Sequence, residues 1–163
     1  MSTLCWKGMI MKIVNILALS AIFAFGSGVS IDTASFKKVI VKTKDNKKKV
    51  EWVKPSKAVP KDTIKVVDTI KNDTNATLNS VKVVNPIDKS LLFQKGSIKS
   101  KLKVTTQFSL DGKKFDNAKN LFVVGKDGKK HLATAKDYKA VQFVIDKVAP
   151  NSKETIEYLT KIK

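Results

Sequence analysis

Two serine–lysine pairs are the first residues whose types and spacing suit covalent chemistry. Ser35 stands three residues before Lys38, and Ser100 stands three residues before Lys103. In penicillin-binding enzymes the serine of such a pair opens a helix, and the lysine follows one turn later on the same face. Both pairs here lie in sequence of strand character, and the Ser-Asp-Asn and Lys-Thr-Gly companions are absent. We therefore predict no acylating serine and no enzymatic activity.

Histidine and cysteine are too scarce for most other catalytic or metal sites. The chain has one histidine, His131, and one cysteine, Cys5. Zinc sites need several such side chains, and a cysteine–histidine nucleophile pair is excluded from the mature protein because Cys5 lies in the N-terminal segment that we predict to be a cleaved signal peptide. Asp111-Gly112 and Asp127-Gly128 lack the spaced acids of a calcium loop, and Asp-Gly is the usual dipeptide of a tight hairpin. We predict no metal, no cofactor and a solvated His131.

Lysine dominates the charge of the chain. All 32 basic residues are lysine, against 14 acidic residues, which gives a formal net charge of +18 and a pI near 10.0. Such a charge attracts polyanions in a salt-dependent way. Specific nucleic-acid recognition usually adds arginine for base contacts and exposed aromatics for stacking. Arginine is absent, and Phe108, Phe143 and Tyr158 are on the core-facing phase of their strands, so we predict no specific nucleic-acid partner.

The densest group of lysines is the first candidate for contact with an anionic surface. It consists of Lys42, Lys44, Lys47, Lys48 and Lys49. Anionic glycans, phospholipid or lipopolysaccharide would be attracted to such a group. Lysine at a hairpin tip also keeps a strand edge soluble and prevents edge-to-edge pairing. The sequence leaves both interpretations open.

Asn75 is a candidate glycosylation site. It begins an Asn-Ala-Thr acceptor sequence, and Asp73 stands two residues before it, as in the longer sequon of some bacteria. The same residues are good turn formers. An exposed turn without any modification therefore explains the sequence as well.

A period of two governs most of the chain. Apolar residues alternate with polar ones over 64–71, 81–83, 104–108, 141–145 and 156–162, and shorter apolar runs occupy 39–41 and 50–53. Turn-forming Asn, Asp and Gly residues separate these runs. Alternation places one face of a strand in a core and the other in water. The pattern predicts an all-β fold, an antiparallel sandwich of seven to nine strands.

Asp68 breaks this pattern. It shares the inward phase of its strand with Val66 and Ile70. A buried carboxylate without a partner is costly. We expect Asp68 to lie near a sheet edge, or to pair with a lysine or a backbone donor.

The N-terminal segment has the three parts of a secretory signal. Lys12 precedes an apolar run over 13–25, and small residues follow over 26–30. We predict a signal peptide over 1–30 with a helical apolar core, and a single domain over 31–163 with a formal charge of +16. Translation from Met9 or Met11 would give a shorter signal. An uncleaved membrane anchor is the alternative, disfavoured because the run is shorter than a spanning helix prefers.

Six short motifs follow one another in order between Val59 and Ile162. They are Pro60-Lys61-Asp62 before a strand ending at Asn72, Val81-Lys-Val-Val-Asn85-Pro86-Ile87-Asp88, Phe93-Gln-Lys-Gly96-Ser97, Ser109-Leu-Asp111-Gly112 leading to Phe115, Tyr138 before Val141-Gln-Phe143-Val-Ile145, and Pro150-Asn151-Ser152. Their order resembles the bacterial conserved-repeat domain of unknown function, family eleven, found in envelope and surface proteins. Lys61 and Asn151 stand where that family has glycine, and Phe143 stands where it has tryptophan.

The resemblance implies an immunoglobulin-like β-sandwich, an exported location and no known catalytic residues. Together with the signal and the lysines, it predicts a non-enzymatic envelope protein of the periplasm or cell surface, a structural or interaction module. Its expected partner is an envelope protein or an anionic envelope polymer, and membrane contact is expected only through an uncleaved N-terminal segment. The alternative is a secreted lysine-rich binder of glycan or nucleic acid. The sequence leaves the oligomeric state open.

Overall fold

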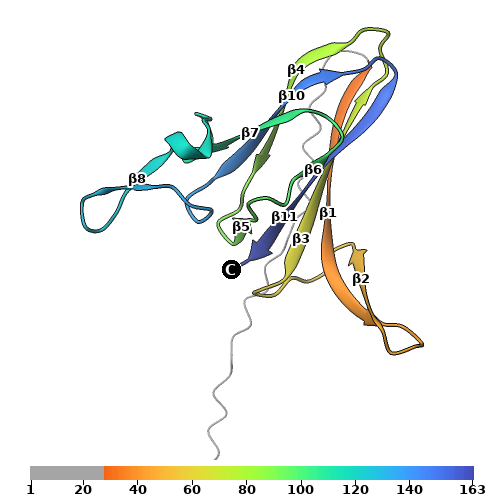
Figure 1. Cartoon of the computed structure of the whole chain (residues 1–163), viewed down its shortest axis with the longest axis horizontal. Coiled ribbons are helices and arrows are strands. Elements are labelled where there is room, and N and C mark those ends of the chain that lie inside the picture. The colour runs from red at the N-terminus through yellow and green to blue at the C-terminus, as the bar shows by residue number, and fades with distance from the viewer. Residues whose placement is uncertain (1–27) are drawn as a thin grey trace, which may run out of the picture.

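The computed structural model describes residues 28–163, and nearly all regular structure in them is β (Figure 1). The strands are β1 (Val29–Lys42), β2 (Lys48–Val53), β3 (Thr63–Asn72), β4 (Leu78–Pro86), β5 (Leu91–Phe93), β6 (Lys99–Ser100), β7 (Val104–Ser109), β8 (Phe122–Val124), β9 (Lys130–Leu132), β10 (Ala140–Val148) and β11 (Ser152–Ile162). A short 3₁₀ helix, η1 (Ala118–Asn120), precedes β8. The predicted signal peptide lies outside the described residues except for its last three positions, of which Val29 and Ser30 already belong to β1.

The prediction of an all-β fold is confirmed, but the predicted number of strands is wrong. The described residues hold eleven strands, and the seven apolar runs found in the sequence correspond to the seven strands of six residues or more. The other four, β5, β6, β8 and β9, have only two or three residues each. Runs of that length are too short to show an alternating pattern.

The strands form three antiparallel sheets. The largest has the order β2-β1-β3-β11-β5, with β6 also paired to β11. The second has the order β4-β10-β7, and β8 and β9 form a separate hairpin. The chain therefore crosses between the two larger sheets four times: between β3 and β4, β4 and β5, β6 and β7, and β10 and β11.

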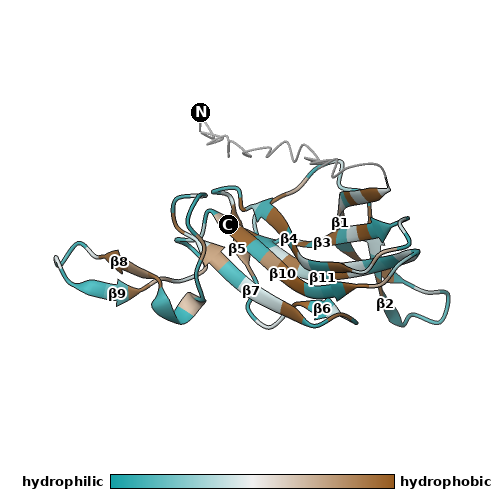
Figure 2. Ribbon diagram, turned by 90° about the horizontal axis from the view of Figure 1, so that it is seen from above, coloured by the Kyte–Doolittle hydropathy of each residue, from teal (hydrophilic) through white to brown (hydrophobic). Residues whose placement is uncertain are grey.

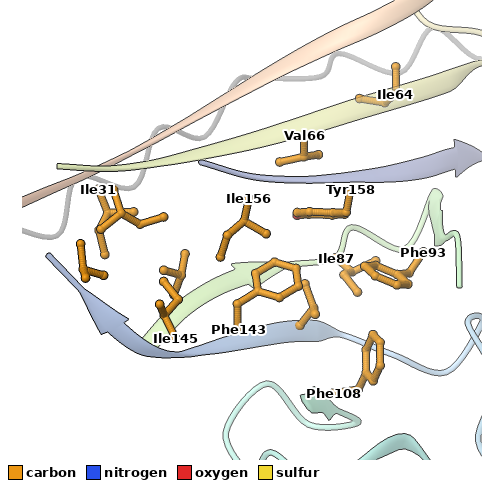
Figure 3. Close-up of a cluster of buried hydrophobic side chains, with 14 of the residues drawn as sticks. Ile31, Ile64, Val66, Ile87, Phe93, Phe108, Phe143, Ile145, Ile156 and Tyr158 are labelled. Atoms are coloured by element: carbon orange, nitrogen blue, oxygen red, sulfur yellow. The ribbon is translucent and has the colours of Figure 1, made fainter. Parts of the chain in front are cut away.

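The core lies between the two larger sheets (Figure 3). β3 and β11 of the larger sheet contribute Ile64, Val66, Ile156 and Tyr158, and β10 of the smaller sheet contributes Phe143. The Phe143 and Tyr158 ring centroids are 5.3 Å apart, and Phe143 has no exposed surface. The alternation of buried and less buried residues along β3 and β11 follows the strand period of two.

Asp68 does lie on the inward face. The prediction that it would lie near a sheet edge, or pair with a lysine or a backbone donor, is wrong. Asp68 is fully buried on β3, between β1 and β11, far from a sheet edge. Thr33 Oγ1 of β1 donates to Asp68 Oδ1 at 2.7 Å, and Asn85 Nδ2 of β4 donates to Asp68 Oδ2 at 2.6 Å. Since β4 belongs to the opposite sheet, the carboxyl group links the two sheets through the core. Side-chain donors thus do what we expected of a lysine or a backbone group.

Left-handed backbone conformations occur at both positions where the resembled family has glycine. Lys61 has φ +76° and Asn151 has φ +48°. Asparagine tolerates this region because its short polar side chain bonds locally, but lysine has no such compensation. The Lys61 N–H donates to the carbonyl of Ile162, which ties this strained turn to the end of β11.

Replacing Lys61 with glycine should raise the free energy of unfolding by roughly 0.5–1 kcal/mol. Relief of the left-handed strain is worth about 1–2 kcal/mol, and the greater freedom of glycine in the unfolded chain offsets part of it. Lys101→Gly is the matched control because Lys101 is exposed in a bend and has no positive φ. Denaturant unfolding of the two variants measures the difference. Equal losses of stability in both would contradict strain at Lys61.

Candidate anionic-surface site

The five predicted lysines gather at the tip of the β1–β2 hairpin, called the lysine hairpin below. Lys42 ends β1, Lys48 and Lys49 begin β2, and Lys44 and Lys47 lie in the connecting turn. The turn closes through hydrogen bonds from Thr43 N–H to the Lys47 carbonyl and from Asn46 N–H to the Thr43 carbonyl, both 2.9 Å. Asn46 supplies the positive φ that this tight connection needs.

The lysine hairpin concentrates positive charge with little internal compensation. All five lysines are exposed, and the register places Lys42 directly opposite Lys48. Within residues 28–163, only Lys49 of the five makes an ion pair, with Glu51 at 3.3 Å. Like charges facing each other across a hairpin weaken it. An anion bound between these side chains would relieve that repulsion.

An aromatic group lies farther along the same face and was missed in the sequence. The register places Ile40 and Val50 beside Lys42 and Lys48, and Trp52 follows two residues after Val50. Lys65 Nζ of β3 lies 4.9 Å from the centroid of the Trp52 ring and 5.7 Å from that of Phe36. These distances are in the range of cation–π attraction. The larger sheet thus carries lysines, apolar side chains and two aromatic rings on its outer face.

Asn75 occupies the turn between β3 and β4, as predicted, and is exposed. Its side-chain oxygen accepts a hydrogen bond of 3.1 Å from Asn151 Nδ2 in the β10–β11 turn. Buried Asn72 supports the same turn by donating to the Ala76 and Ala149 carbonyls and accepting from the Thr74 N–H. The two turns are therefore joined side by side. Glycosylation of Asn75 stays a prediction.

The other residues considered for chemistry serve the strands and turns. Ser35 and Lys38 both belong to β1, where a separation of three places their side chains on opposite faces. His131 is exposed, and its Nε2 lies 2.9 Å from Asp127 Oδ1. Asp111 accepts hydrogen bonds from the N–H groups of Lys113 and Lys114, which lower the pKa of its carboxyl group to about 2. Asp111 therefore fixes a hairpin turn.

A hollow of about 480 Å³ is lined by the ends of β5 and β7, by the 3₁₀ helix η1 and by the chain from the end of β9 to Tyr138. Its aromatic lining includes Phe93, Phe108 and Tyr138, and the rings of the last two stack with centroids 4.2 Å apart. Lys95 and Lys119 also line it. No sequence motif indicated this hollow because its residues come from four separate stretches of the chain.

Residues 28–163 contain no cluster of three histidine, cysteine or acidic side chains that could hold a metal ion. No helix in this described part is long and apolar enough to cross a membrane. No family model, no curated protein and no solved structure matches this chain.

Proposed function

We propose that this chain is an exported, non-enzymatic module of the cell envelope, in the periplasm or at the cell surface. Its lysine hairpin contacts an anionic envelope polymer, with glycan chains as the first candidate. The observation that carries the proposal is the pairing of Lys42 with Lys48 across the tip, with Lys44 and Lys47 between them and one acid, Asp45, in the turn. A bound polyanion would offset the repulsion among these lysines.

An immunoglobulin-like sandwich is the finer fold that we propose. Two antiparallel sheets enclosing one core support it, and so do the left-handed Lys61 and Asn151 at the family's glycine positions. One difference from an immunoglobulin constant domain concerns the last two strands. They pair with each other in that domain, whereas β10 and β11 lie in different sheets here. The resemblance to family eleven stays a prediction.

A second kind of envelope partner is a protein strand added to the sheet. β2 ends the larger sheet and pairs, within the described residues, only with β1, so its outer edge is open. Main-chain hydrogen bonds would hold such a partner. Because these bonds depend little on ionic strength, a strand-added partner would stay bound in salt that removes a polyanion.

Neutralising the lysine hairpin is expected to weaken binding of a soluble anionic glycan, with heparin as the probe. We expect a loss of about tenfold or more at low salt, because each lysine near an anionic surface contributes on the order of 1 kcal/mol. The test variant replaces Lys42, Lys44, Lys47 and Lys48 with glutamine. The control makes the same change at four exposed lysines elsewhere, Lys82, Lys99, Lys101 and Lys153.

The two variants separate the proposed site from the alternative function. A loss confined to the hairpin variant, steeply dependent on salt, supports the lysine hairpin as the contact. Equal losses in both variants would overturn it and favour a secreted polyanion binder whose lysines act together over the whole surface.

A further inference from the structure

The β8–β9 hairpin projects from the body of the protein, at the end of the long axis opposite to β2 (Figures 1 and 2). Its two strands of three residues pair only with each other among the described residues. The Ala133 N–H donates to the Leu121 carbonyl at 2.8 Å, which holds the base of the hairpin together. Beyond that base, the hairpin has no sheet to cover its faces.

One face of this hairpin is apolar and open to solvent. Phe122 pairs with Leu132, and Val124 pairs with Lys130, so these four side chains lie on the same face. Phe122 is 52% exposed, Val124 is 69% exposed and Leu132 is 53% exposed. Figure 2 shows β8 as a hydrophobic strand at this end of the molecule. Leu132 also lines the aromatic hollow, so the apolar surface continues from the hairpin into the body.

The surroundings of this apolar face are strongly basic. Residues 113–139 contain eight lysines and three aspartates. Each aspartate already has a local partner: Asp127 bonds to His131, Asp137 accepts from the Thr134 N–H, and Asp116 accepts from the Asn117 N–H. Lys126, Lys129 and Lys130 are exposed at the turn itself. The end of the molecule therefore offers apolar side chains within positive charge.

Hydrogen bonds fix the conformation of the turn between β8 and β9. The Gly125 N–H donates to the Lys129 carbonyl at 2.9 Å, and the Lys129 N–H donates to Asp127 Oδ1 at 3.1 Å. A Cβ at Gly125 would lie 2.6 Å from Asp127 Oδ1, so glycine leaves the space in which Asp127 bonds to His131. These contacts hold the apolar side chains in place before any partner arrives, which lowers the entropy cost of binding.

We propose that the β8–β9 hairpin docks on an anionic lipid bilayer, with Phe122 and Val124 entering the interface and Lys126, Lys129 and Lys130 contacting the head groups. Buried apolar area and attraction to anionic lipid are the two terms that drive interfacial binding, and this hairpin supplies both. A soluble polyanion would use the lysines alone. A stable protein partner needs roughly 800 Å² per side, more than three exposed apolar side chains provide.

Tryptophan placed at the hairpin tests the proposal at a single position. Phe122→Trp of the full chain is mixed with phosphatidylcholine vesicles that contain, or lack, phosphatidylglycerol. We expect its emission to shift to shorter wavelength and to be quenched by brominated lipid in the anionic vesicles only. Ile40→Trp is the matched control, since Ile40 is 63% exposed on the opposite hairpin. The unsubstituted protein supplies the background of its own two tryptophans.

A second pair of variants tests both terms of the interaction by vesicle co-sedimentation. Phe122→Ser with Val124→Ser should lower the hairpin-dependent binding by about tenfold or more, from the lost apolar burial. Lys126→Gln with Lys129→Gln should make this binding depend less on the anionic lipid content, because fewer cationic side chains contact the head groups. The apolar run over 13–25 is the same in every variant, so any binding through it contributes equally to all of them.

The quenching results either support or contradict docking of the β8–β9 hairpin on lipid. Quenching of Phe122→Trp but not of Ile40→Trp supports the proposal. Quenching of Ile40→Trp alone would make the lysine hairpin the lipid contact and overturn it, and so would vesicle binding in which neither tryptophan is quenched. Because glycan binding is assigned to the opposite hairpin, heparin affinity can be retained when lipid docking fails, and the failure of each proposal is seen separately.

Discussion

Replacing Phe143 with alanine is expected to lower the free energy of unfolding by about 3–5 kcal/mol. Phe143 lies in the middle strand of the smaller sheet and has no exposed surface. Its ring packs against Tyr158 of the opposite sheet. Removing it leaves a cavity between two sheets whose strands are fixed by hydrogen bonds, so neighbouring side chains can fill little of the space.

Denaturant unfolding followed by circular dichroism measures this loss. Phe122→Ala removes the same ring from a half-exposed position and is the matched control, with an expected loss below about 0.5–1 kcal/mol. Phe143→Leu should lie between the two because it keeps most of the apolar volume. Similar losses for Phe143→Ala and Phe122→Ala would show that the core does not depend on this ring.

Five of the seven long strands could be predicted because apolar and polar residues alternate along them, and β1 and β2 could be predicted from short apolar runs. The β8–β9 hairpin could not, since Leu121-Phe122-Val123-Val124 is an unbroken apolar run of four residues followed by a basic turn. Such a run does not reveal which side is buried, and here two of its four side chains are exposed. The period of two describes strands that cover a core, and this hairpin does not cover one.

The lysine hairpin could be found in the sequence, but its aromatic neighbours could not. Five lysines close together in the sequence stay together at a hairpin tip. Phe36, Trp52 and Lys65 come from three different strands, and the register alone brings them to one face. In β1 and β2 apolar residues occur on both phases, as Val39 and Ile40 show, so the alternation does not identify the outer face.

The two proposed contacts have one consequence in common. The lysine hairpin and the β8–β9 hairpin lie at opposite ends of the molecule (Figure 2). A protein docked on lipid through β8–β9 would therefore present the lysine hairpin away from the bilayer. That orientation suits a module that connects a membrane surface to anionic polymer beyond it.

Asp68→Ala is the second change with a large expected effect, a loss of about 2–4 kcal/mol in the free energy of unfolding. The variant leaves the Thr33 hydroxyl and the Asn85 amide without their acceptor in the core, and each buried unpaired group costs about 1–3 kcal/mol. Asp68→Asn keeps the shape and one acceptor oxygen. It should therefore lose less than the alanine variant.

Asp68 should also impose a pH dependence opposite to that of the exposed aspartates. Burial raises the pKa of its carboxyl group above the ordinary 3.8, and the hydrogen bonds from Thr33 and Asn85 offset only part of that effect. Among the described residues no lysine forms an ion pair with it. The folded protein thus binds this proton more tightly than the unfolded chain. Its contribution to stability is complete below pH 3.8 and is lost as the pH rises through the folded pKa.

Other carboxyl groups titrate with the opposite sign. Hydrogen bonds lower the pKa values of Asp88, Asp111 and Asp127 in the folded protein, so their contributions are lost as the pH falls. The difference in unfolding free energy between the unsubstituted protein and Asp68→Asn, measured from pH 3 to 8, cancels these shared contributions. As the pH rises above 3.8, the unfolding free energy of the unsubstituted protein should fall relative to that of Asp68→Asn. A difference that stays constant over this range would mean that Asp68 titrates alike in the folded and unfolded chains. The prediction that the link between the two sheets is pH-sensitive would then be wrong.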